Sequence, residues 1–194
     1  MSPVARDRSV FLITSNIHKF NEARRILGEH KIATAMLKHI QKVEIQDDKL
    51  ENVAKISAAD AYERCKLPAI VEDAGLFIDA LGGFPGPYSS FVFKTIGCRG
   101  IIKLMENESN RKAHFKSVVA FFGPEIVESM YFVGEIEGSI VEQQRGIHGF
   151  GFDPIFEPFA SKKTFAEIVM EQKNRLSHRS VAFRKFAEWF LENS

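Results

Sequence analysis

The spacing of apolar residues changes along this chain, and that change constrains the fold more than any other feature. Up to residue 71, short apolar runs that predict buried strands alternate with stretches at helical spacing. From residue 112 to residue 137, two long runs flank Gly123-Pro124, a pattern typical of paired antiparallel strands. A β-α-β start followed by an antiparallel ribbon predicts an α/β fold with a mixed sheet flanked by helices.

The expected elements follow from the same spacing, with Gly and Pro marking the breaks. Strands are expected at Ser9 to Ile13, Lys42 to Ile45, Ala69 to Val71, Lys112 to Phe122 and Val127 to Glu137. Helices are expected from the turn at Asn16 to Lys19 as far as about Glu29, then at Leu50 to Cys65, Gly100 to Met105 and Ser180 to Asn193. Leu81 to Ser90 and Arg145 to Pro154 are expected to be irregular. The 194 residues contain no repeat or linker, so one domain is expected across 1–194.

Composition narrows the classes of function. The chain has 26 Lys and Arg against 25 Asp and Glu, so its net charge of +1 argues against a nucleic-acid surface. A small anionic ligand needs only a few local cations. Two isolated cysteines, Cys65 and Cys98, and no apolar stretch of membrane-spanning length favour a reduced, cytoplasmic protein without a membrane partner.

A first candidate site is the turn Thr14-Ser15-Asn16-Ile17-His18-Lys19, between the first strand and its helix. Unpaired backbone N–H groups and the helix dipole favour an anion at such a turn, and Lys19 adds a full charge. A plain capped helix start is the alternative, because the glycines of the common phosphate-binding loops are missing.

A pair of acids, Glu72-Asp73, follows the strand that is expected at Ala69 to Val71. Carboxylates at strand ends are well placed for function in α/β sheets, and Mg²⁺ prefers oxygen ligands. Glu44 could add a further ligand. A solvated turn is the alternative for any one of these acids.

Two later segments could bind a base. Phe150-Gly151-Phe152-Asp153 offers aromatic faces, a flexible glycine and a carboxylate, although such a turn also packs well into a core. Ser177-His178-Arg179 precedes the last helix, where Ser177 is a good N-cap and its neighbours could donate hydrogen bonds. Lys55 and Lys173 are uninformative by themselves.

Together, in this order, the four segments resemble the inosine triphosphate pyrophosphatase family. The resemblance covers Phe11 to Phe186 and includes the loop from Gly82 to Tyr88 and the pair Ala166-Glu167. It implies an elongated mixed sheet with helices, in two lobes around a nucleotide cleft, and a homodimer. It also implies Mg²⁺-dependent hydrolysis of ITP, dITP and XTP to the monophosphate and pyrophosphate, which cleanses the nucleotide pool.

The resemblance assigns roles to individual residues. They are the Thr14 to Lys19 turn and Lys55 for the phosphates; Glu44 and Asp73 for the metal, with Asp73 also as general base; Phe150, Gly151, Phe152 and Asp153 for base and sugar; Ala74, next to the acid, for substrate; and Lys173, His178 and Arg179 for base and phosphate. Phe152 stands where some relatives have Trp or Tyr, and Ala74 where many have Ser.

Three other functions stay open at this point. A related pyrophosphatase would act on modified pyrimidine or methylated guanine triphosphates. A nucleotide-binding regulator would not need both Glu44 and Asp73. An RNA-binding module is disfavoured by the small net charge.

Overall fold

The computed structural model describes residues 8–43, 45–124 and 126–193. Its centre is a seven-stranded sheet in the order β2-β1-β3-β5-β6-β7, with β4 paired to β3. The strands are β1 (Ser9–Ile13), β2 (Ala33–Leu37), β3 (Ala69–Ile78), β4 (Pro85–Gly86), β5 (Lys112–Phe122), β6 (Met130–Ile140) and β7 (Phe156–Pro158). β1 runs parallel to β2 and β3, and the other pairs are antiparallel, so the predicted mixed sheet is confirmed.

Helices cover the sheet on both faces. They are α1 (Ile17–Glu29), α2 (Leu50–Cys65), α3 (Ser89–Thr95), α4 (Gly97–Leu104), α5 (Met170–Leu176) and α6 (His178–Asn193), with 3₁₀ turns η1 (Asp79–Leu81), η2 (Asp153–Ile155) and η3 (Phe165–Glu167). Within the described ranges, none of them combines the length and the apolar character that a bilayer span requires.

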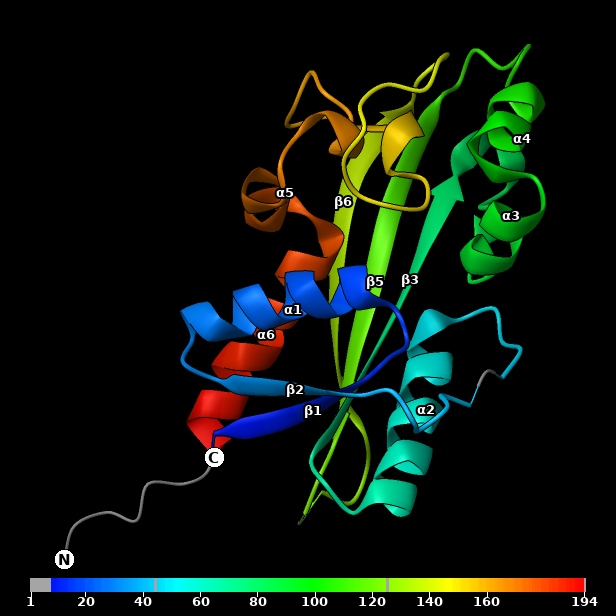
Figure 1. Cartoon of the computed structure of the whole chain (residues 1–194). Helices are drawn as coiled ribbons and strands as arrows, with labels where there is room; N and C mark the ends of the chain where they lie inside the picture. The colour runs from blue at the N-terminus through cyan, green and yellow to red at the C-terminus, as the bar shows by residue number, and fades with distance from the viewer. Residues whose placement is uncertain (1–7, 44, 125, 194) are drawn as a thin grey trace, which may run out of the picture.

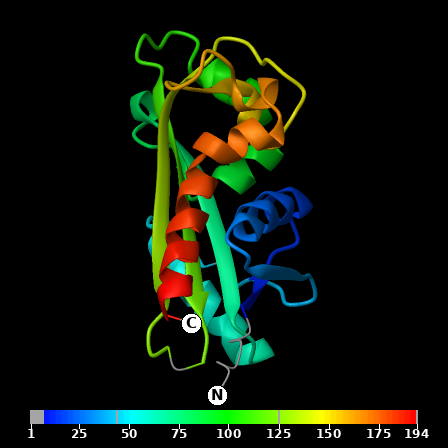
Figure 2. The ribbon, with the colours of Figure 1, turned by 90° about the vertical axis from the view of Figure 1, so that its left-hand side faces the viewer.

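The long strands β3, β5 and β6 connect two parts of an elongated molecule. In Figure 1, α1, α2, α6, β1 and β2 surround the lower part of these strands, while α3, α4, α5 and the segment after β6 surround the upper part. Figure 2 shows α6 lying along the sheet, with the orange segment that leads into it closing over the upper end.

The edge of β3 is only partly used by neighbouring strands. β1 pairs with Ala69 and Ile70, and β4 pairs with Leu76 and Phe77. Between them, within the described residues, positions 71–75 have no strand partner on that side. Backbone groups there are free to meet other groups, and this gap lies between the two parts of the molecule.

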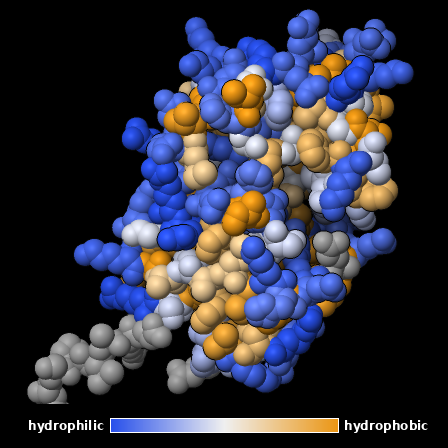
Figure 3. All heavy atoms as spheres, viewed as in Figure 1, coloured by the Kyte–Doolittle hydropathy of each residue, from blue (hydrophilic) through white to orange (hydrophobic). Residues whose placement is uncertain are grey.

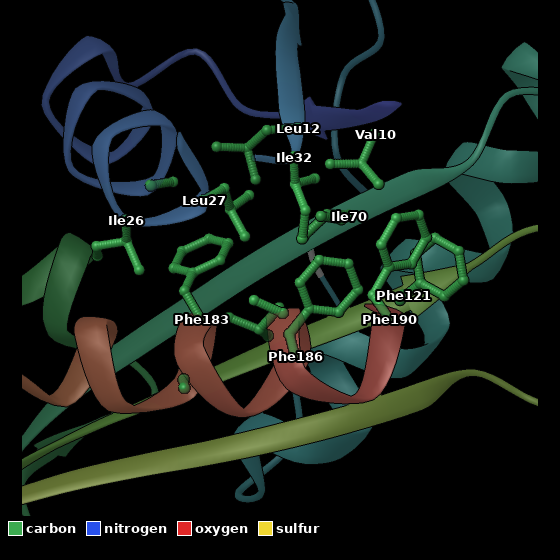
Figure 4. Packing of buried hydrophobic residues seen from close by; sticks show 14 residues of the cluster. Val10, Leu12, Ile26, Leu27, Ile32, Ile70, Phe121, Phe183, Phe186 and Phe190 are labelled. Atoms are coloured by element: carbon green, nitrogen blue, oxygen red, sulfur yellow. The ribbon is translucent and has the colours of Figure 1, made fainter. Parts of the chain in front are cut away.

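The lower core lies on both faces of the sheet. On one face, Phe183, Phe186 and Phe190 of α6 point toward Ile26 and Leu27 of α1 and toward the sheet (Figure 4). On the other face, the small residues of α2 pack on Val71 and Val118. The helical spacing predicted the apolar helix faces that make these contacts, because residues three and four apart share one helix face.

A separate aromatic cluster holds the upper part together. Phe115 of β5 packs against Phe156 of β7 and Phe165 of η3, with ring centroids 4.7 and 6.0 Å apart. Phe152, Val92 and Ile101 belong to the same buried cluster. The segment after β6 is therefore anchored to the sheet, although much of it is irregular.

Two of the strand predictions were wrong. The strand expected at Lys42 to Ile45 is absent at the described positions there, and the second strand is β2, nine residues earlier by its first residue (42 − 33). β2 forms because it pairs along its whole length with β1, and single-sequence spacing could not show that pairing. The strand expected to end before Glu72-Asp73 continues to Ile78, since β5 pairs with all of it.

Other boundaries moved by a few residues. α1 begins at Ile17, inside the expected turn, and α6 begins at His178 and not at Ser180. β6 begins at Met130, three residues later than expected. Lys173, expected in an irregular run, lies in α5. The expected strands at Ser9–Ile13 and Lys112–Phe122 and the helix at Leu50–Cys65 are confirmed.

Candidate active site

Glu72 and Asp73 lie beside the unpaired edge of β3 and face opposite sides of the sheet. Neighbouring strand residues alternate faces. Ile70 belongs to the core under α1 and α6, and Val71 to the core under α2. Glu72 is therefore on the α6 side and Asp73 on the α2 side. The two acids that the sequence presents as a pair enter different environments.

Glu72 is part of a buried charge network. Its Oε1 accepts hydrogen bonds from Ser117 Oγ at 2.7 Å and from Arg179 Nε at 3.0 Å. Its Oε2 pairs with Lys19 Nζ at 2.8 Å, and the same ammonium lies 3.4 Å from the Glu72 carbonyl oxygen. This contact joins the start of α1 to the free edge of β3.

Glu22 extends the network toward α5. Its carboxylate accepts from Arg179 Nη1 at 2.6 Å and pairs with Lys173 Nζ at 3.0 Å. Lys173 Nζ also donates to Asp153 Oδ2 at 2.6 Å. Each of these four side chains is less than 6 % exposed. Buried charges are stable only when they are paired, and here each cation bridges two carboxylates.

Burial and charge compete in setting the pKa values. Burial alone would raise the pKa of Glu72, but the charges of Arg179 and Lys19 outweigh it and hold that pKa far below its usual range. The same balance, with Arg179 and Lys173, lowers the pKa of Glu22. At Asp153 the effect of burial exceeds that of the Lys173 charge, so the pKa of this carboxyl is raised. Burial would lower the Arg179 pKa, but Glu72 and Glu22 raise it instead.

The start of α6 is fixed by close packing. Ser177 Oγ accepts from the Ser180 N–H at 3.2 Å, which confirms the predicted cap. A Cβ at Gly134 of β6 would lie 2.1 Å from the His178 carbonyl oxygen, so only glycine lets the helix approach this strand. His178 stacks on Phe115 with centroids 4.6 Å apart. Burial, Arg179 and Lys173 lower its pKa well below the usual value, which favours the neutral imidazole.

The turn before α1 bonds largely to itself. Asn16 caps the helix, because its Oδ1 accepts from the N–H groups of His18 and Lys19 at 2.9 and 3.2 Å. The Asn16 N–H donates to Thr14 Oγ1 at 3.1 Å. A phosphate at this turn would meet the N–H groups of Ser15 and Ile17, or would compete with these side chains for the others. Lys19 supplies the charge in either case.

Asp73 is the more accessible acid. Its side chain is 18 % exposed and pairs with the ammonium of Lys42. The carboxylate is paired with the Lys42 ammonium, and its oxygens are the kind of ligand that a hard divalent cation prefers. Mg²⁺ is commonly held by one or two carboxylates and by substrate phosphates, so Asp73 fits that role. Within the described residues no three metal-ligating side chains gather, and Glu44 lies outside those residues.

The aromatic segment divides its two rings between different surroundings. Phe150 is half-buried and lies over Lys173 Nζ and Arg179 Cζ, at 4.9 and 5.3 Å from its centroid. Phe152 is 3 % exposed and meets Phe93 edge-on in the upper core. Gly151, between them, has a φ of +62°, which favours glycine. Phe150 thus lies beside the charge network, and Phe152 packs behind it.

Lys55 and Ala74, which were also predicted to contact the substrate, lie outside the buried charge network. Lys55 places its ammonium over the Tyr131 ring, 5.5 Å from the centroid, and its carbonyl oxygen accepts from Ser129. It is therefore not joined to the network around Glu72. Ala74 follows Asp73 in the part of β3 that has no strand partner on one side within the described residues.

Sequence reasoning missed Glu22, Lys42 and Ser117. Glu22 had a usable signal, because it falls on the apolar face of α1, between Phe20 and Ile26, where an acid is rarely buried without a partner. Lys42 and Ser117 gave no such signal. Their partners, Asp73 and Glu72, are far away in sequence.

Comparison with known proteins identifies the family. A family model described as the Ham1 family matches residues 10–189. The chain belongs to the Ham1 family. It is 47 % identical over 187 residues to a protein of Hyperthermus butylicus named dITP/XTP pyrophosphatase, with 95 % of this chain and 96 % of that protein covered. A protein of Methanopyrus kandleri with the same name is 48 % identical, with 95 % and 97 % covered.

Solved structures of Ham1 proteins share the fold. The HAM1 protein of Coxiella burnetii superposes with a TM-score of 0.84 at 28 % identity, covering 95 % of this chain and 98 % of that one. The Ham1 protein of Staphylococcus aureus gives 0.81 at 25 % identity, covering 96 % and 100 %. This agrees with the mixed sheet and the flanking helices.

Proposed function

We propose that this Ham1 family member hydrolyses non-standard purine nucleoside triphosphates, namely ITP, dITP and XTP, to the monophosphate and pyrophosphate. Two features on either side of one strand edge carry the proposal: a half-buried aromatic ring with fixed cations over it on the α6 side, and an accessible carboxylate, Asp73, on the α2 side of β3. The names of the relatives agree with it, and their match covers nearly the whole chain.

The residues divide the reaction among them. Lys19 and Lys42 lie at the edge of β3 and would neutralise phosphate charge. Asp73 would orient the attacking water or accept its proton as the water oxygen bonds to the α-phosphorus. The bond from that phosphorus to the bridging oxygen then breaks, and pyrophosphate leaves. A divalent cation, which we take to be Mg²⁺, would be held by Asp73 and would supply further charge neutralisation when bound.

Base choice would come from fixed donors. Hypoxanthine and xanthine present a carbonyl oxygen where adenine presents an amine. The Arg179 guanidinium is held by Glu22 and Glu72 through two of its nitrogens, which leaves Nη2 for an acceptor. An amine facing such a donor leaves both unpaired, which costs about 1–3 kcal/mol.

We propose that the protein acts on the nucleotide pool of the cytoplasm. We also propose that it forms a homodimer. Exposed apolar side chains on and beside α3 support pairing, among them Tyr88, Phe91 and Ile96, of which Phe91 is 68 % exposed. Figure 3 shows hydrophobic residues at the surface in this upper right region, inside a mostly hydrophilic rim. Light scattering would test the proposed dimer by giving twice the 21.9 kDa mass of one chain.

Product analysis tests the reaction. Incubation of ITP with Mg²⁺ should give IMP and pyrophosphate, whereas IDP and orthophosphate as first products would contradict the proposal. The panel should include XTP, dITP, ATP, a modified pyrimidine triphosphate and a methylated guanine triphosphate. Preference for either of the last two would favour the related pyrophosphatase. Binding without any turnover would favour a regulator.

A further inference from the structure

The imidazole of His18 stacks on the Phe150 ring, with centroids 5.3 Å apart and planes 20° apart. His18 comes from the first turn of α1, and Phe150 from the irregular segment after β6. His18 is exposed and Phe150 is half-buried, and neither belongs to a core cluster. Two flat rings from different segments, stacked at the surface, have the form of a slot for a third flat ring.

Phe150 is the fixed wall of this slot. Its N–H donates to Asp153 Oδ2 at 2.8 Å, and a Cβ at the preceding Gly149 would lie 2.1 Å from the same oxygen. The backbone is therefore pressed against a buried carboxylate. Lys173 and Arg179 hold their charges over the ring and are themselves fixed by Glu22. Cations against an aromatic face stabilise the position of that ring.

His18 is the movable wall. Its backbone is held, because Asn16 Oδ1 accepts from its N–H, but its exposed side chain makes no hydrogen bond within the described residues. A third ring needs contact distances of about 3.5 Å on each side, so the two walls must separate from 5.3 Å to roughly 7 Å. Rotation of one exposed side chain is enough for that change.

We propose that the nucleobase inserts between His18 and Phe150, so that His18 binds the base and not the phosphates. This rests on the proposed function and adds to it a second aromatic wall. Lys19, the next residue, reaches the edge of β3, so a single helix turn serves base and phosphate with adjacent side chains. A slot with two walls favours purines over pyrimidines, because a purine presents the larger stacking surface.

The test separates base from phosphate by using a probe that has no base. KM and kcat for ITP, the Kd of IMP by calorimetry and the inhibition constant of inorganic tripolyphosphate are measured for the unchanged protein and for His18→Ala, His18→Phe and Asn21→Ala. Asn21 is exposed on the same helix and serves as the matched control. Melting temperatures show that each variant is folded.

We expect His18→Ala to raise the KM for ITP and the Kd of IMP by about 5- to 100-fold, the range for one base–aromatic stack. Its tripolyphosphate inhibition constant should stay within twofold, and His18→Phe should restore most of the affinity. Equal weakening of tripolyphosphate, or no recovery in His18→Phe, would assign His18 to the phosphates and overturn the inference. So would an unaltered Kd of IMP in His18→Ala, or no IMP binding by the unchanged protein. Failure of the proposed function shows separately, as the absence of ITP turnover by the unchanged protein.

Discussion

The two faces of β3 treat adjacent acids in opposite ways. On the α6 side, Glu72 is 5 % exposed and bonded to Ser117, Arg179 and Lys19. On the α2 side, Asp73 is partly exposed, and among the described residues its ion-pair partner is the partly exposed Lys42. The first environment fixes charges in place at the cost of dehydrating them. The second leaves a carboxylate available for water or a cation. One strand thus separates a set of paired, buried charges from the carboxylate that we propose takes part in the reaction.

The same contrast explains why the network needs so many members. Lys173, Glu22, Arg179 and Glu72 alternate in sign, so no buried charge lies next to a like charge without an opposite one between. These residues come from α5, α1, α6 and β3, and joining them ties the upper and lower parts of the molecule together. Preorganised charges of this kind stabilise a developing charge without having to rearrange.

The largest effect, a loss of unfolding free energy, is expected from a change on the buried side, at Glu72. Glu72→Gln leaves Arg179 and Lys19 without their shared carboxylate, and loss of one partner of a buried pair costs about 3–5 kcal/mol of unfolding free energy. Denaturant unfolding measures this. Glu171→Gln removes an exposed acid paired with Arg25 and should leave the free energy of unfolding almost unchanged, because solvent screens that pair. Equal losses in the two variants would contradict the division between the faces.

The next largest effect, a loss of turnover, is expected from a change on the more accessible side, at Asp73. Asp73→Asn should lower kcat for ITP by about 10²-fold or more, with a smaller loss of unfolding free energy than Glu72→Gln, because its carboxylate acts on the reaction and not on the fold. Steady-state kinetics and melting curves on one preparation measure both. Asp48→Asn, which makes the same change at an exposed acid outside the proposed site, is the control. Near-normal turnover in folded Asp73→Asn would remove this residue from the mechanism.

A third change sharpens the role of the network in base choice. Arg179→Lys keeps the charge between Glu22 and Glu72 but loses the planar fork of donors. The ratio of kcat/KM for ITP to kcat/KM for ATP should fall by a factor that corresponds to about 1–3 kcal/mol, the cost of one lost hydrogen-bond donor. Arg184→Lys on the same helix is the control, since its pair with Glu29 is at the surface. Equal slowing of both substrates would make Arg179 a structural residue.

The smallest effect is a dependence on acid pH. The folded-state pKa of Glu72 lies below its unfolded value, so the unfolded chain takes up the proton first as the pH falls. The stability contribution is complete above about pH 5 and declines below it. For one carboxyl with an unfolded pKa near 4.3, the loss is about 1 kcal/mol between pH 5 and 3.5.

Denaturant unfolding at these two pH values would measure that loss. Glu72→Gln should show a shallower decline than the unchanged protein, because it has no proton to bind at this position. A decline of the same size in both proteins would show that Glu72 is not a source of the acid sensitivity.

Local spacing was enough to predict much of the fold. The α2 stripe, the core face of α6 and the β5–β6 ribbon all follow from which residues share a face. It was not enough for β2 or for the length of β3, because both depend on partners far away in the chain. A strand of mixed polarity is stable once its backbone is paired, whatever its own pattern predicts.

The sequence by itself determined the inventory of the site: the capped turn with Lys19, the acids at 72 and 73, Phe150, and the cations at 173 and 179. Tertiary structure alone decided how they are divided. Strand alternation sent Glu72 and Asp73 to opposite faces, and packing buried Lys173 in a helix and brought Glu22 and Lys42 to them as partners. Side-chain chemistry is local and can be read in sequence order. Burial and ion pairing depend on distances between segments, and only the folded chain sets those distances.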